Sequence, residues 1–99
     1  MKTYRISAEA INDLDTIWLY TKETWSVKQA DRYYSLIMAE IEYIVQNTES
    51  GKSIDGLKEG YRVSKVKSHL IFYKKQNEQV IDVIRILHQR MDIENRLNQ

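Results

Sequence analysis

Cysteine is absent from this 99-residue chain, and so is any long apolar run. Without cysteine the chain can form neither a disulfide framework nor a thiolate nucleophile or thiolate metal site, which suits a reducing compartment. No apolar run approaches the ~18 residues that span a bilayer, and residues 1–7 lack the apolar core of a signal peptide. We therefore expect a protein with no membrane segment that acts in the cytoplasm.

Glycine is also scarce, and no single sign of charge dominates. Gly51, Gly56 and Gly60 lie too far apart to form a glycine-rich phosphate loop. The net charge is only +1, although residues 58–90 are locally basic, with eight Lys or Arg against three Asp or Glu. These features argue against a nucleotide-binding enzyme and against affinity that depends on many phosphate contacts. The length and the 42% hydrophobic content predict one compact domain, residues 1–99, with a single core.

The first half of the chain predicts a strand followed by two helices. Residues 3–7 alternate as in a short strand, and Ser7 stands at a helix N-cap position. An amphipathic helix is expected from Ala8 to about Thr24, and Ser26 can cap a second, longer helix that reaches Val45. So few residues join the two helices that they must fold back as a hairpin. The spacing of apolar residues in the second helix could also suit a coiled-coil seam, but it covers too few heptads, so packing within the chain is favoured.

The second half predicts a sheet. Residues 47–56 are polar and read as a loop, whereas 61–64, 68–73 and 80–88 are rich in β-branched and aromatic residues. The polar residues 76–79 have hairpin length, which predicts a three-stranded antiparallel meander. The expected fold is α+β in the order β-α-α-β-β-β, with the helical hairpin packed on one face of a small twisted antiparallel sheet. Residues 93–99 are expected to form a short helical turn.

The last predicted strand is apolar on both faces. Strict alternation places Ile81, Val83 and Leu87 on one face, and places Ile84 and Ile86 on the other. A strand of this kind is normally covered on both sides, yet the chain has only one helical hairpin. The uncovered face is therefore a candidate partner surface. The alternative is that the C-terminal tail or the loop covers it.

Several motifs occur in a specific order along nearly the whole chain. They are Ser7, Ala10, Asp13 and Leu14; Trp25, Gln29, Ala30 and Tyr33; Gly60 to Arg62; Ser68 to Tyr73; and Arg85 to Asp92. Each is weak alone, but their order and spacing together are specific. With these motifs the chain resembles the ParE toxins of the RelE/ParE superfamily of bacterial toxin–antitoxin modules.

The resemblance implies a toxin that is not itself an enzyme and needs no cofactor. Its expected partners are DNA gyrase, which such toxins inhibit or poison, and a cognate ParD-like antitoxin. An antitoxin of that type is a ribbon-helix-helix DNA-binding protein whose C-terminal tail wraps the toxin and fills an apolar groove. We expect no sequence-specific DNA binding by this chain. A disordered tail needs a large apolar surface to offset its ordering entropy, which agrees with the two apolar strand faces.

Large aromatics and the residues of the open strand face are the expected partner contacts. The predicted partner-binding residues are Trp18, Tyr34, Arg62, His69, Ile71, Tyr73, Arg85, Leu87, His88 and Arg90.

The competing function in the same superfamily is a RelE-like, ribosome-dependent mRNA endonuclease. Its catalytic set here would be Arg62, His69, Arg85 and His88, with one imidazole acting as base and the other as acid. Ser64 stands where such enzymes tend to carry a second basic residue, and a net charge of +1 suits ribosomal RNA poorly. The gyrase inhibitor is therefore the favoured prediction, with no catalytic residue.

The two histidines also have simpler interpretations. His69 fits a half-buried strand histidine, and His88 fits a local ion-pair cluster at the end of its strand. A metal site formed with Asp82 or Asp92 lacks any ligand spacing, so no metal site is predicted. An interaction module without toxicity, such as a degenerate plasmid-stabilisation protein, stays open.

Overall fold

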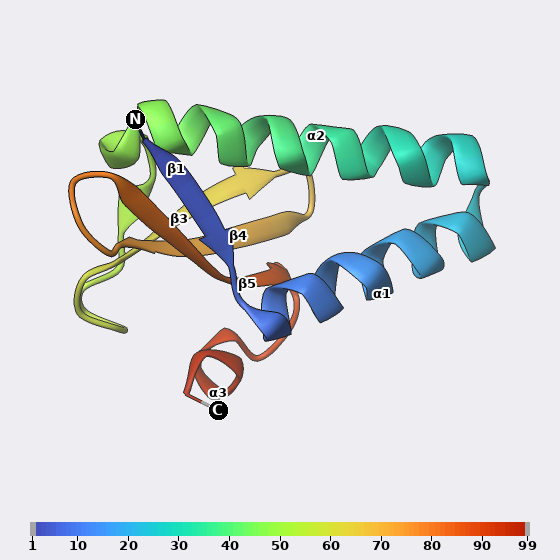
Figure 1. Ribbon diagram of the computed structural model, residues 1–99. Coiled ribbons are helices and arrows are strands. Elements are labelled where there is room, and N and C mark those ends of the chain that lie inside the picture. Colours follow the sequence, from blue (N-terminus) through green and yellow to red (C-terminus); the bar gives the residue numbers. More distant parts are fainter. Residues whose placement is uncertain (1, 99) are drawn as a thin grey trace.

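Two long helices lie against one face of a five-stranded sheet in the computed structural model, which describes residues 2–98 (Figure 1). The elements in chain order are β1 (Thr3–Ile6), α1 (Ala8–Thr24), α2 (Val27–Gln46), the 3-10 turn η1 (Thr48–Ser50), β2 (Lys52–Ser53), β3 (Tyr61–Val66), β4 (His69–Lys75), β5 (Val80–His88) and α3 (Ile93–Leu97). The predicted α+β class, helical hairpin and short C-terminal helix are confirmed. Met1, at the start of the predicted domain, and Gln99, the predicted end of the C-terminal turn, lie outside the described residues.

Both predicted helix caps are present. The Ser7 hydroxyl accepts a hydrogen bond from the Ala10 backbone N–H at 3.0 Å, and the Ser26 hydroxyl accepts one from Gln29 at 3.1 Å. These bonds satisfy backbone donors that a helix start leaves without a partner. Only Trp25 and Ser26 separate α1 from α2, so the two helices run antiparallel. Within residues 2–98, no helix is both long and apolar enough to cross a membrane.

The strand order is β1-β5-β4-β3-β2, and two of its features go beyond the predicted meander. Strand β1 pairs with β5 in parallel, whereas the other neighbours are antiparallel, so the prediction of an antiparallel sheet is wrong for β1. Strand β2 has only two residues, within the segment predicted as a loop. Strand β2 is too short to show the alternation by which a sequence pattern reveals a strand. The pairing of β1 could not be predicted from local patterns, because its partner β5 lies more than 70 positions away.

A β-bulge interrupts the pairing of β4 with β5. Phe72 pairs with Arg85 and Tyr73 pairs with Val83, so Ile84 is the extra residue. The bulge moves Ile86 to the same core as Val83. The prediction of strict alternation through the whole strand is therefore wrong beyond Ile84.

The main core lies between the hairpin and the sheet. Its buried residues are Ala10, Leu14, Ile37, Ile41, Ile44, Ile71, Tyr73, Ile81, Val83 and Ile86. The apolar stripe of α2 thus packs within the chain, as favoured over a coiled-coil seam. Tyr73 is fixed at the edge of this core, because its hydroxyl donates to the Thr48 carbonyl at 2.8 Å and accepts from the Gly51 N–H at 3.0 Å. A Cβ at Gly51 would lie 2.3 Å from the Tyr73 hydroxyl oxygen, so only glycine fits.

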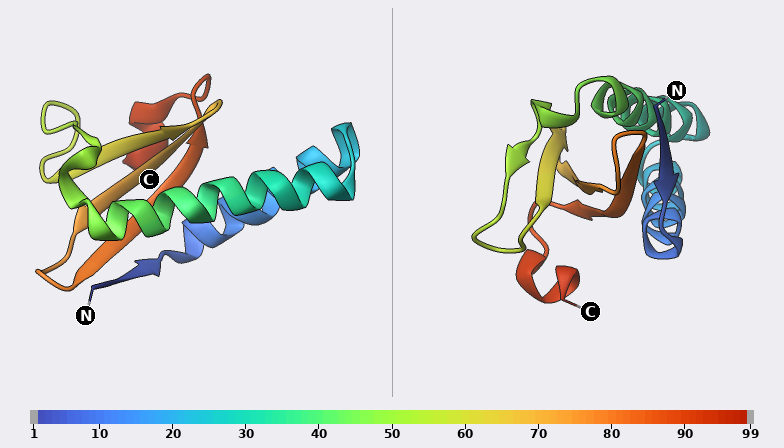
Figure 2. Two further views of the ribbon diagram at one scale, coloured as in Figure 1. Left: turned by 90° about the horizontal axis from the view of Figure 1, so that it is seen from above. Right: turned by 60° about the vertical axis from the view of Figure 1, so that its left-hand side comes forward.

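A second, smaller cluster covers the opposite face of the sheet. Phe72 and Leu87 pack with Leu97 of α3, and partly buried residues join them: Ile54, Val63, Leu70 and Ile93. The right-hand view of Figure 2 shows α3 on the side of the sheet away from α2. The prediction that this face is open for a partner is therefore wrong, because the tail and the loop cover it.

Asp13 joins α1 to the free edge of β5. Strand β1 ends at Ile6, opposite Val83, and the next polar groups of the β5 edge bond to α1 and its cap instead. The Ser7 hydroxyl donates to the Ile84 carbonyl at 2.6 Å, and the Asp13 carboxylate accepts from the Ile86 N–H at 2.9 Å. The same carboxylate accepts from Nε and Nη2 of Arg85 at 2.8 and 2.9 Å.

We expect Asp13→Ala to lower the free energy of unfolding by about 3 kcal/mol, because it leaves a mostly buried guanidinium without its counter-ion. The Arg85 and Asp13 side chains are only 13% and 11% exposed. Urea denaturation measures the effect. The matched control is Asp15→Ala on the exposed side of the same helix, which should change stability by no more than about 0.5 kcal/mol. Equal unfolding midpoints for the two variants would contradict this role of Asp13.

Candidate functional site

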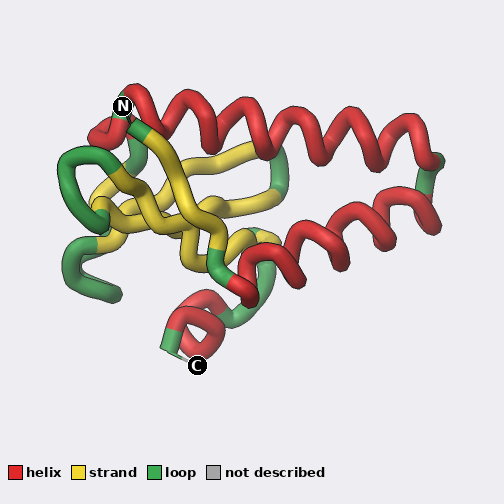
Figure 3. Tube along the Cα trace, viewed as in Figure 1, coloured by secondary structure: helices red, strands yellow, loops and turns green. Residues whose placement is uncertain are grey.

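The hairpin is longer than the sheet that it covers. Its far end, where α1 meets α2, projects beyond the strands (Figures 1 and 3). Large hydrophobic residues are exposed along the two helices of the hairpin: Ile11, Leu19, Tyr20, Trp25, Val27 and Tyr34. Exposed apolar groups gathered in this way mark a surface that binds something. Two clefts lie on this part of the molecule.

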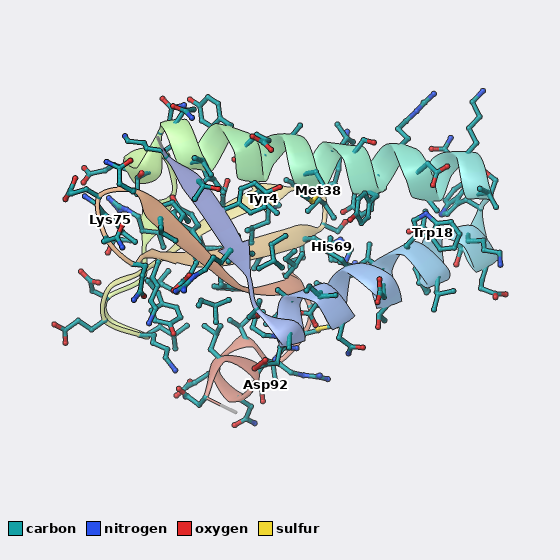
Figure 4. The ribbon with its side chains drawn as sticks, in the orientation of Figure 1. Tyr4, Trp18, Met38, His69, Lys75 and Asp92 are labelled. Carbon is teal, nitrogen blue, oxygen red and sulfur yellow. The ribbon has the colours of Figure 1, made fainter. Side chains whose placement is uncertain are left out.

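The inner cleft lies between the hairpin and the ends of β4 and β5. Its volume is about 400 Å³, and its lining residues are Tyr20, Thr21, Trp25, Gln29, Tyr33, Lys67, Ser68, His69 and His88. Figure 4 shows His69 in the space between α1 and α2, at the edge of the sheet.

The outer cleft lies between the two helices. Its volume is about 560 Å³, and its lining residues are Asp15, Trp18, Leu19, Asp31, Tyr34 and Ser35. The Trp18 indole N–H donates to Asp31 Oδ1 at 2.9 Å, which holds the ring across the hairpin. The outer cleft therefore combines a fixed aromatic wall with two carboxylates.

A hydrogen-bonded chain forms the floor of the inner cleft. The Tyr33 hydroxyl lies 3.1 Å from the Val66 carbonyl and 2.6 Å from His69 Nδ1. A carbonyl can only accept, so the one hydroxyl proton goes to Val66 and Nδ1 of His69 carries the proton donated to Tyr33. This assignment leaves His69 Nε2 as the unprotonated nitrogen. His88 lies directly across the strand pair, with ring centroids 5.2 Å apart and an interplanar angle of 87°.

Burial keeps both Tyr33 and His69 neutral. Desolvation, together with a smaller effect of the neighbouring His88, lowers the pKa of His69 to about 4. Desolvation also raises the pKa of Tyr33 above its usual value. At neutral pH the His69 imidazole is therefore unprotonated on Nε2 and has no proton to give from that atom.

The structure does not bring the four residues of the endonuclease alternative together. His69 and His88 are neighbours, but Arg62 pairs with Tyr73 while Val66 pairs with His69. Arg62 lies four positions before Val66 on β3, a distance of about 13 Å along the strand. Arg85 is held in its ion pair with Asp13, and this raises the pKa of its guanidinium. Arg62 therefore lies away from the two imidazoles, and Arg85 is not a free cation.

Three of the predicted partner contacts are corrected by the structure. Ile71, Tyr73 and Leu87 are 0%, 0% and 1% exposed, because the helical hairpin covers Ile71 and Tyr73 while α3 covers Leu87. Their side chains cannot reach a partner.

The other predicted contacts lie in different places. Trp18 and Tyr34 line the outer cleft, while His69 and His88 line the inner cleft. The exposed Arg90 lies next to the inner cleft, where its backbone N–H donates to His88 Nδ1 at 3.1 Å.

Seven lining residues of the inner cleft were not predicted as a site: Tyr20, Thr21, Trp25, Gln29, Tyr33, Lys67 and Ser68. Tyr20 lies in the last turns of α1, and Trp25 lies between α1 and α2. The signal that could have found them is a large aromatic at the tip of a hairpin, where no core exists to bury it.

Comparisons with known proteins agree with one another. The family described as the ParE toxin of type II toxin-antitoxin system, parDE, matches residues 4–93. The chain is 37% identical to Toxin ParE1 of Mycobacterium tuberculosis over 94 residues, which cover 95% of this chain and 96% of that protein. It is 39% identical to Toxin ParE1 of Caulobacter vibrioides over 92 residues, covering 93% and 94%. A solved structure described as the chromosomal ParDE TA system from P. aeruginosa has the same fold, with a TM-score of 0.77, 17% identity, and coverage of 89% of this chain and 96% of that one.

We expect the ring resonances of His69 to titrate near pH 4 in an NMR experiment, well below the ordinary histidine value of 6.5. Because the unfolded chain takes up this proton at higher pH than the folded chain, stability should fall as pH drops from 6.5 to 4. A His69→Gln variant should lose this part of the pH dependence of unfolding. A His69 midpoint at or above 6 would contradict the desolvated, neutral ring.

Proposed function

The chain belongs to the ParE toxin family of type II toxin–antitoxin systems, as its motifs indicated, and from that premise we propose that it inhibits DNA gyrase and is neutralised by a cognate antitoxin. The observation that carries this proposal is the family match over residues 4–93. Gyrase acts on chromosomal DNA, so the proposed site of action is the bacterial cytoplasm.

The geometry supports a binding role more than a catalytic one. Arg85, which a phosphate-cleaving site would need as a free cation, is occupied by Asp13. Arg62 lies at the far end of its strand, and His69 is neutral. By contrast, the hairpin carries exposed aromatics beside two clefts, the arrangement typical of protein-binding surfaces.

For the antitoxin we propose a ParD-like ribbon-helix-helix protein with a toxin-binding C-terminal tail. A solved neighbour of the same fold is described as a ParDE system, which supports an antitoxin partner. The outer cleft is the proposed anchor site, because Trp18 and Tyr34 present aromatic surface between two exposed helix faces. His69, His88 and Arg90 are proposed as further contacts on the inner side.

One observation favours the RelE-like mRNA endonuclease as a second candidate. The rings of His69 and His88 lie 5.2 Å apart beside an open cleft, and His69 Nε2 can accept a proton. This candidate needs only two of the four predicted residues to act together.

Purified protein at micromolar concentration should inhibit the supercoiling of relaxed plasmid by gyrase or trap cleaved DNA. Addition of the cognate antitoxin should restore gyrase activity. The same preparation is tested on translating ribosomes with wild-type protein and His88→Ala. An unaffected gyrase together with codon-dependent mRNA cuts that His88→Ala reduces would replace the gyrase proposal with the endonuclease.

We expect Tyr34→Ala to weaken antitoxin binding at least tenfold, because aromatic anchors at interface centres carry about 2 kcal/mol or more. Tyr43→Ala is the matched control, since Tyr43 is also an exposed tyrosine of α2, at 52% against 40% for Tyr34, and does not line the outer cleft. Isothermal titration calorimetry measures both affinities. An equal loss of affinity in the two variants would show that the antitoxin does not bind at the outer cleft.

A further inference from the structure

The inner cleft has an exposed aromatic rim. Trp25 and Tyr20 are 74% and 68% exposed, the highest values among the large hydrophobic residues that the structure describes. Both line the inner cleft: Tyr20 lies near the end of α1, and Trp25 lies in the two-residue connection between α1 and α2. Aromatic side chains left in water at the rim of a concave site supply binding energy when a ligand covers them.

Charge separates the inner cleft from the outer one. Among the described residues that line the inner cleft, Lys67 alone carries a formal charge, and none of them is Asp or Glu. The outer cleft has the opposite pattern, with Asp15 and Asp31 and no lysine or arginine in its described lining. The inner cleft therefore favours an anionic group and the outer cleft disfavours one.

The inner cleft also offers hydrogen-bond donors of fixed identity. His88 Nδ1 accepts from the Arg90 backbone N–H, so the proton of the neutral ring lies on Nε2, which is a donor.

Lys67 holds a position that lysine rarely takes. It lies in the two-residue turn between β3 and β4, closed by the Val66 and His69 pair, and its φ is +54°. Glycine or asparagine is the usual residue in this left-handed region. The turn fixes the Lys67 backbone at the mouth of the cleft, close to the histidine pair.

We propose that the inner cleft binds an acidic peptide segment of a partner protein, with an aromatic side chain of the segment packed against Tyr20 and Trp25 and a neighbouring carboxylate bound by Lys67 and His88. A peptide fits better than a small molecule, because the rim aromatics stay mostly exposed around an open cleft, whereas small-molecule sites enclose most of their ligand. The inference depends on this surface alone and stands whether the toxin acts on gyrase or on the ribosome.

Two peptides that differ only in charge test the proposal. Acetyl-Glu-Trp-Glu-amide and acetyl-Gln-Trp-Gln-amide are titrated into the labelled full-length protein and followed by NMR. The acidic peptide should bind about fivefold or more tightly than its neutral counterpart. The shifted signals should be the Trp25 indole N–H, the Lys67 amide and the His88 ring, with little change at the Trp18 indole.

Three variants separate the charged contact from the aromatic one. Lys67→Asn removes the ammonium but suits the left-handed backbone, so it should abolish the preference for the acidic peptide and keep the weaker aromatic binding. Trp25→Ala should weaken both peptides. Lys65→Asn removes an exposed lysine of the same strand that does not line the cleft, and it should leave both affinities unchanged.

Several outcomes would overturn the proposal. Equal binding of the two peptides, no binding of either, or shifts centred on Trp18 and Tyr34 would each remove it. An equal loss of preference in Lys67→Asn and Lys65→Asn would show a general charge effect instead of a site. Tighter binding of free N-acetyltryptophan than of the acidic peptide would make the cleft a small-molecule site and reject the peptide.

Discussion

The structure depends on one carboxylate, that of Asp13. It accepts the Ile86 N–H where β1 no longer covers β5, and it receives two hydrogen bonds from Arg85. Helix α1 is thereby fixed to the edge of the sheet by a side chain in the way that a strand would be fixed by its backbone. The direction of α1 then determines where the hairpin ends and which parts of it extend beyond the strands. The same bonds occupy the arginine that a phosphate-cleaving site would require.

The projecting hairpin explains why a chain with a nearly balanced charge has surfaces of distinct character. The end of the hairpin where α1 meets α2 projects beyond the strands (Figure 1). Beyond the sheet, the apolar stripe of each helix has no core to enter, so aromatics stay exposed there. One side of this extension is acidic and the other carries lysine and histidine. The two sides of one hairpin therefore suit groups of opposite charge.

Sequence patterns predicted the elements well because caps, apolar periodicity and turn residues are local. Ser7, Ser26 and the stripe of α2 lie where they were expected. The bulge at Ile84 could not be predicted, because it is defined by pairing with another strand, and it reversed the faces of the residues after it. The Asp13 and Arg85 pair joins residues 72 positions apart, so the sequence showed two charged residues but not their contact. The cover over the second sheet face was predicted only as the less favoured alternative, because three of its members, Ile54, Ile93 and Leu97, lie in a loop and a five-residue helix with little pattern.

The guanidinium of Arg85 also bonds in a third direction. Its Nη1 donates to the Arg96 carbonyl of α3 at 3.2 Å, while Nε and Nη2 hold Asp13 of α1. Helices on opposite faces of the sheet therefore share one rigid, planar group. A movement of α3 away from the sheet must break a bond of the same group that positions α1. The C-terminal helix and the hairpin are thus joined directly through the Arg85 side chain, in addition to the sheet that both pack against.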